Sequence, residues 1–133
     1  MIRQLTAWLP PVLLYALITV QSSFPMVIAR RLIPHQDKIA HFLIFALLSG
    51  LIARGLSTVR PCTVSLGRCL VAAAAVATLL GVVDEIHQAF NPARTAEVLD
   101  ACADLGGAIV GAGLFGYIAR RHAARGDVDG QAG

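Results

Sequence analysis

The stretch LGRCLVAAAAVATLLGVVDEIHQA, residues 66–89, decides the fold class of this chain. Before the acidic pair Asp84-Glu85 it contains a single charged residue, Arg68, and it has no proline. A helix needs roughly 20 apolar residues to cross the ~30 Å hydrocarbon core of a bilayer. The stretch therefore predicts a transmembrane helix that carries polar residues near its C-terminal end.

Three further apolar stretches, residues 5–20, 39–56 and 98–119, are separated from it by turn and charge signals. Four spans with short connections use nearly all of the 133 residues. Only 14% of the residues are charged, whereas a soluble domain carries about a quarter. We predict an all-α, polytopic membrane protein, a four-transmembrane-helix bundle over residues 1–120, followed by a disordered polar tail at 121–133.

The first stretch has two readings. Arg3, the apolar run and the small residues near Ser22 also fit a cleavable signal peptide. The pair Pro10-Pro11 would kink a spanning helix, although neighbouring helices can satisfy the freed carbonyl groups. Both readings, a retained helix and a signal peptide, stay open on the sequence.

Basic residues predict the orientation. With a cytoplasmic N-terminus, seven of them fall on the cytoplasmic side: Arg3, Arg54, Arg60, Arg68, Arg120, Arg121 and Arg125. Four fall on the opposite side: Arg30, Arg31, Lys38 and Arg94. Because cytoplasmic loops are enriched in Lys and Arg, we predict an inner (plasma) membrane protein with both termini in the cytoplasm.

Connectivity brings polar residues together at the membrane face opposite the termini. The second apolar stretch begins there, the third ends there and the fourth begins there. Residues four apart share a helix face, and three such pairs occur here. The predicted ligand-binding or polar-network set is Asp37, Lys38, His41, Asp84, Glu85, Gln88, Arg94, Asp100 and Asp104.

Small residues continue the same helix faces. They let helix backbones approach closely in lipid, so the faces that carry the charges are also expected to pack. Arg94 can hold a carboxylate with two hydrogen bonds, and Asp100 or Glu85 is the natural candidate. The predicted packing set is Ala73, Ala77, Gly81, Gly107 and Gly111, the last two forming a GxxxG pair.

Other functional classes find less support. No basic stripe accompanies the net charge of +3, so we expect no nucleic-acid partner. The three cysteines show no CxxC spacing and form neither a disulfide framework nor a zinc module. A metal site built from His41, His87, Asp84 and Glu85 is conceivable, but no helix carries two histidines at ligand spacing. We therefore predict no metal and no cofactor.

The motifs resemble those of a known family. Asp37-Lys38-Ile39-Ala40-His41-Phe42 resembles the DKxxHF opening of the VanZ-like membrane proteins. The segment Asp84-Glu85-Ile86-His87-Gln88, with Phe90, Pro92 and Arg94, is similar to that family's DExxQ–F–P–R segment, and Asp100, Asp104 and Gly107 match its D–N–G spacing. The resemblance covers residues 37–111. Departures are Asp104 for Asn, Phe45 for Tyr, Ala93 for Gly, and Glu97 near a usual Ser.

The resemblance implies a small bacterial membrane protein with a cell-envelope role. The family is named for a protein associated with low-level teicoplanin resistance, and its biochemical activity is not established. We expect the polar cluster to bind an envelope lipid or a glycopeptide-type ligand, without catalysis, since no catalytic motif is recognisable.

Two alternatives remain open. The first is an intramembrane enzyme acting on a lipid-linked substrate, with Glu85 or Asp84 as general base and His41 as proton shuttle. The second is a purely structural network of charges that holds the helices of the bundle together. Separately, we interpret Glu97, Arg30 and Arg31 as residues that anchor the helix ends at the membrane interface. The lipid bilayer is the expected partner in every case, and the sequence does not specify an oligomeric state.

Overall fold

The computed structural model describes residues 2–23, 35–59, 65–90 and 97–131. These residues form four helices and contain no strand. The predicted all-α fold with four apolar helices is confirmed. The helices are α1 (Ile2–Ser23), α2 (Gln36–Val59), α3 (Leu66–Ala89) and α4 (Val98–Gln131).

All four helices are long and apolar enough to cross a membrane. Large apolar side chains cover the outside of the bundle, for example Leu17, Leu47, Leu79 and Leu114. Several acidic side chains are instead buried between the helices. Because water would favour the opposite distribution, the chain is a multi-pass membrane protein whose outer surface suits a lipid bilayer.

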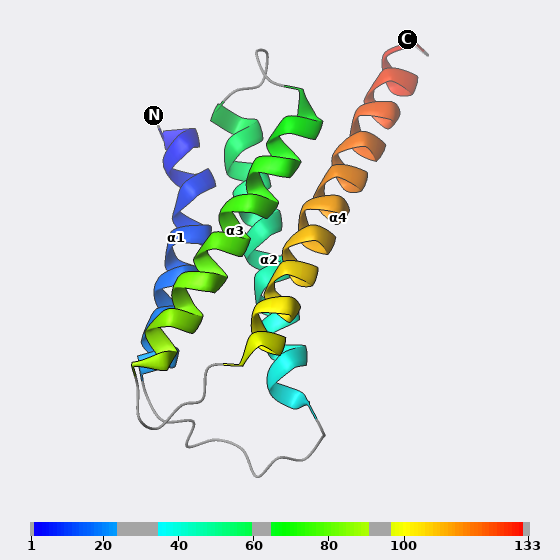
Figure 1. The fold of residues 1–133 in the computed structure, drawn as a ribbon. Helices are drawn as coiled ribbons and strands as arrows, with labels where there is room; N and C mark the ends of the chain where they lie inside the picture. Colours follow the sequence, from blue (N-terminus) through cyan, green and yellow to red (C-terminus); the bar gives the residue numbers. More distant parts are fainter. Residues whose placement is uncertain (1, 24–34, 60–64, 91–96, 132–133) are drawn as a thin grey trace.

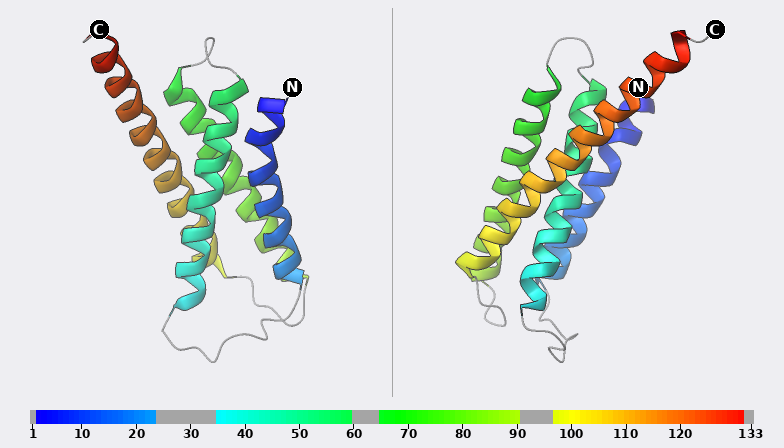
Figure 2. Two further views of the ribbon diagram at one scale, coloured as in Figure 1. Left: turned by 180° about the vertical axis from the view of Figure 1, so that it is seen from behind. Right: turned by 90° about the vertical axis from the view of Figure 1, so that its right-hand side faces the viewer.

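Helix α2 occupies the centre of the bundle and contacts the other three helices. Helices α1 and α4 lie on opposite sides of it, as Figures 1 and 2 show, and their described residues make no contact with each other. Both chain ends lie at one end of the bundle (Figure 1). The polar residues at the start of α2, the end of α3 and the start of α4 therefore gather at the other end.

Glycines permit a close approach of α2 and α4. A Cβ atom at Gly107 would overlap the carbonyl oxygen of Phe42, and one at Gly111 would overlap that of Ala46. Backbone contact of this kind leaves no room for a side chain, as small-residue interfaces in membranes require. On α3, the small residues Ala73, Ala77 and Gly81 are buried as well.

Helix α1 runs without interruption from Ile2 to Ser23 and includes Pro10 and Pro11. It contacts α2 and α3, and the hydroxyl of Tyr15 donates a 3.4 Å hydrogen bond to the carbonyl oxygen of Leu80. Helix α1 is thus part of the packed bundle.

Helix α4 extends beyond the fourth apolar stretch of the sequence. The fourth apolar stretch ends near Ala119, and α4 continues past it to Gln131. Arg and Ala, which favour helices, follow Ala119, and no proline interrupts the segment. The disordered polar tail at 121–133 stays a prediction.

Candidate functional site

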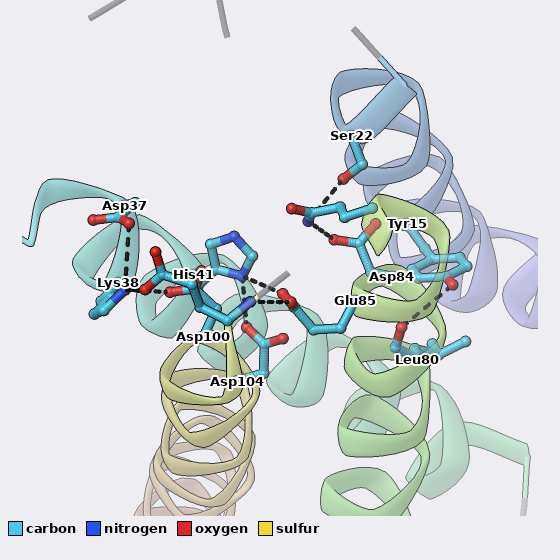
Figure 3. A network of polar contacts seen from close by, with 12 residues as sticks. Tyr15, Ser22, Asp37, Lys38, His41, Leu80, Asp84, Glu85, Asp100 and Asp104 are labelled. Carbon is cyan, nitrogen blue, oxygen red and sulfur yellow. Dashed lines mark hydrogen bonds and ion pairs between the residues drawn. The ribbon is translucent and has the colours of Figure 1, made fainter. Parts of the chain in front are cut away.

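Buried polar side chains mark one end of the bundle as the candidate site. They come from the last turns of α3 and the first turns of α4, with Ser22 from α1, and α2 adds the partly buried Lys38 and His41 (Figure 3). Ionisable groups buried at membrane depth are costly and are usually paired or functional. The buried acidic and amide members are Asp84, Glu85, Gln88, Asp100 and Asp104.

Lys38 is the centre of a first group, which we call the Lys38 cluster. Its Nζ lies 2.7 Å from Glu97 Oε2, 3.0 Å from Asp100 Oδ1 and 3.4 Å from Asp37 Oδ2. The Asp100 side chain is only 8% exposed, whereas that of Glu97 is 43% exposed. One ammonium group thus joins the start of α2 to the start of α4, and its pair with Asp100 is the better shielded from water.

His41, Glu85 and Asp104 form a second group, the His41 cluster. His41 Nδ1 lies 3.0 Å from Asp104 Oδ1 and 4.0 Å from Glu85 Oε1. Each residue comes from a different helix, so this cluster ties α2, α3 and α4 together. A Cβ atom at Gly81 would lie 2.7 Å from Asp104 Oδ2. The absence of a side chain at Gly81 therefore makes room for the buried Asp104 carboxylate.

Asp84 and Gln88 belong to a third group, on the side of α3 that faces α1. Gln88 Nε2 donates a 2.8 Å hydrogen bond to Asp84 Oδ2 and lies 3.5 Å from Ser22 Oγ on α1. Close by, His87 Nε2 lies 3.1 Å from Ser23 Oγ. Asp84 and Glu85 are neighbours in sequence but have different partners: Asp84 bonds to Gln88, which reaches Ser22 of α1, whereas Glu85 lies beside His41 of α2 (Figure 3).

A small pocket of about 50 Å³ opens between α1, α2 and α3. Its volume suits one or two water molecules, an ion or a single small polar group. The polar side chains in its lining include Asp37, His41, Asp84 and Gln88, and its apolar side is formed by Ile18, Ile44 and Phe45.

Most of the residues predicted from sequence lie together at this end, although in separate groups. Arg94 lies outside the described residues, so its pairing with Asp100 or Glu85 stays a prediction. Glu97 was interpreted only as an interfacial anchor, yet it pairs with Lys38, and its backbone N–H donates to Glu85 Oε2 at 3.3 Å. Its position three residues before Asp100, which places the two close together on a helix, is the signal that could have identified it.

Fold and site define a polytopic membrane protein with a buried acidic site at one end of its bundle. The family model VanZ/LLP1 matches residues 4–119, most of the chain, and the protein belongs to this family. No curated protein and no solved structure matches the chain.

Proposed function

We propose that the protein acts in the cell envelope by binding the charged head of an envelope molecule in the pocket between α1, α2 and α3. Family membership and the multi-pass fold support an envelope role. The main support for the proposal is the pocket, in which the buried Asp84 lies beside the apolar side formed by Ile18, Ile44 and Phe45. Binding sites for small ligands combine apolar walls with a few convergent polar groups in this way.

The charge of the described residues favours a cationic group as the ligand. Lys38 already contacts three carboxylates, and His41 contacts Asp104. Asp84 receives a hydrogen bond from the neutral Gln88, and its Oδ1 has no hydrogen-bond partner among the described residues. A primary ammonium, as in an aminophospholipid head group or an amino group of a glycopeptide, would complement this carboxylate.

Binding of such a head group is expected to depend on Asp84. Purified full-length protein in lipid nanodiscs should retain phosphatidylethanolamine in preference to phosphatidylglycerol in native mass spectrometry. Asp84→Asn keeps the shape of the side chain and removes its charge, and we expect a preference reduced about tenfold, or ~1.4 kcal/mol.

The matched control is Asp127→Asn, which removes the same charge from the far end of α4 and should leave the preference unchanged. Equal retention of both lipids by the unmodified protein, together with failure of glycopeptide to bind, would contradict the proposal.

Orientation is part of the proposal, because an envelope ligand reaches the pocket from outside only if both termini are cytoplasmic. Single cysteines at Gln36 and at Thr58 lie at opposite ends of α2. In a background lacking Cys62, Cys69 and Cys102, we expect an impermeant thiol reagent to label position 36 and not position 58 in intact cells. The reverse pattern would place the pocket in the cytoplasm and exclude an extracellular ligand.

A second candidate function is intramembrane acid–base catalysis on a lipid-linked envelope substrate. It is favoured by the contact of His41 with two carboxylates, since a histidine oriented by a carboxylate is a common general base. Turnover of a lipid-linked precursor by the purified protein, lost in His41→Gln, would support this candidate. Binding without turnover would support the first.

A further inference from the structure

The His41 cluster has the composition of a metal site. His41, Glu85 and Asp104 each offer one ligand atom, and the three atoms lie within 4.8 Å of one another. One imidazole nitrogen and two carboxylate oxygens are donors that divalent transition metals accept. The ligands come from α2, α3 and α4, so the three helices would have to be assembled for the site to exist.

Unpartnered oxygen atoms provide an independent observation. Glu85 is 9% exposed, and its Oε1, which points toward His41 Nδ1 at 4.0 Å, has no hydrogen-bond partner among the described residues. Asp104 is 1% exposed, and its Oδ2 also lacks a partner there. Buried polar atoms normally have partners, so these two carboxylates have unused capacity to hold a cation.

The Lys38 cluster gives an internal comparison. Its three carboxylates surround a permanent cation, the ammonium group of Lys38. Among the described residues, the side chain that faces the two carboxylates of the His41 cluster is an imidazole, and Glu85 also accepts from the backbone N–H of Glu97, although both carboxylates are more deeply buried than Asp37 or Glu97. A buried carboxylate without a compensating charge is strongly unfavourable, and a divalent cation would supply that charge.

We propose that His41, Glu85 and Asp104 bind a divalent transition-metal cation of the zinc or manganese type. Three protein ligands leave further coordination positions for water or another ligand, as in catalytic rather than structural zinc sites. This inference goes beyond head-group binding and does not depend on it. It also differs from the sequence-based expectation of no metal. The metal site considered from the sequence included His87 and Asp84, but in the structure His87 contacts Ser23 and Asp84 accepts a hydrogen bond from Gln88. Asp104 is the third ligand instead.

The test is direct metal binding by the purified full-length protein in nanodiscs after treatment with a chelator. Titration with Zn²⁺ alone and with Mn²⁺ alone, followed by calorimetry and by manganese EPR, should give one ion per chain. Glu85→Gln and Asp104→Asn should each weaken binding at least tenfold. Glu97→Gln, which removes a carboxylate from the Lys38 cluster, should bind as the unmodified protein does.

Several results would overturn the proposal. The first is that no metal binds to the unmodified protein, and the second is that Glu85→Gln binds metal with unchanged affinity. The third is that Glu97→Gln loses as much metal affinity as Glu85→Gln, which would place the ion in the Lys38 cluster. Addition of Co²⁺ to the unmodified protein gives a second measurement that needs no variant. Bound Co²⁺ should show the ligand-field absorption expected for an ion coordinated by nitrogen and oxygen atoms. Asp84→Asn, by contrast, should lose head-group preference and keep the metal, which separates the two proposals.

Discussion

Replacement of Gly111 by alanine is expected to remove most of the folded protein from the membrane, whereas Gly113→Ala should be tolerated. A Cβ at Gly111 would overlap the carbonyl oxygen of Ala46 and lie 2.6 Å from its carbonyl carbon. These are backbone atoms, so α2 and α4 would have to separate along their main contact. Overpacking commonly costs about 1–3 kcal/mol and occasionally more, and a backbone clash belongs at the upper end of this range.

Gly113 is a matched control on the same helix, because no heavy atom lies within 4 Å of a Cβ built there. Alanine is the better helix former by about 1 kcal/mol, so Gly113→Ala should equal or exceed the unmodified protein in stability. The measurement is the amount of protein in membranes together with thermal unfolding in detergent. Equal stability of the two variants would mean that α2 and α4 do not approach as closely as the structure places them.

Lys38→Met is expected to produce the largest electrostatic loss. It removes the ammonium group and leaves the carboxylates of Asp37, Glu97 and Asp100 without their shared partner. Breaking a buried ion pair on one side costs about 3–5 kcal/mol, but only Asp100 is well buried here, and exposed pairs contribute little. We therefore expect a loss of ~2–3 kcal/mol, carried mainly by the pair with Asp100.

A double variant distinguishes this explanation from a simple loss of packing. If the uncompensated Asp100 carboxylate causes the loss, Lys38→Met combined with Asp100→Leu should be more stable than Lys38→Met alone. Thermal unfolding of the single and double variants measures the coupling between the two positions. Additive losses would show that the charge pair does not stabilise the contact between α2 and α4.

The sequence alone determined the four helices. Each apolar stretch is long enough to span a bilayer, and this property depends only on local composition. Connectivity then placed the ends of α2, α3 and α4 that carry charge at the same end of the bundle. The GxxxG spacing of Gly107 and Gly111 likewise indicated a packing face before any partner was known, and the structure places both glycines against α2.

Only the tertiary structure decided how the polar residues are divided among partners. Asp84 and Glu85 are adjacent in sequence, yet Asp84 lines the pocket between α1, α2 and α3, whereas Glu85 lies beside His41 of α2 and accepts from the backbone of Glu97 next to α4. Successive residues of an α-helix point about 100° apart, so their neighbours depend on how α3 is rotated within the bundle. That rotation follows from packing among all four helices at once, for example the fit of Asp104 against Gly81. The spacing of small residues on α3 indicated which face of the helix packs, but not which helix each polar residue meets. The pairing of Lys38 with Glu97 likewise depends on how α2 packs against α4.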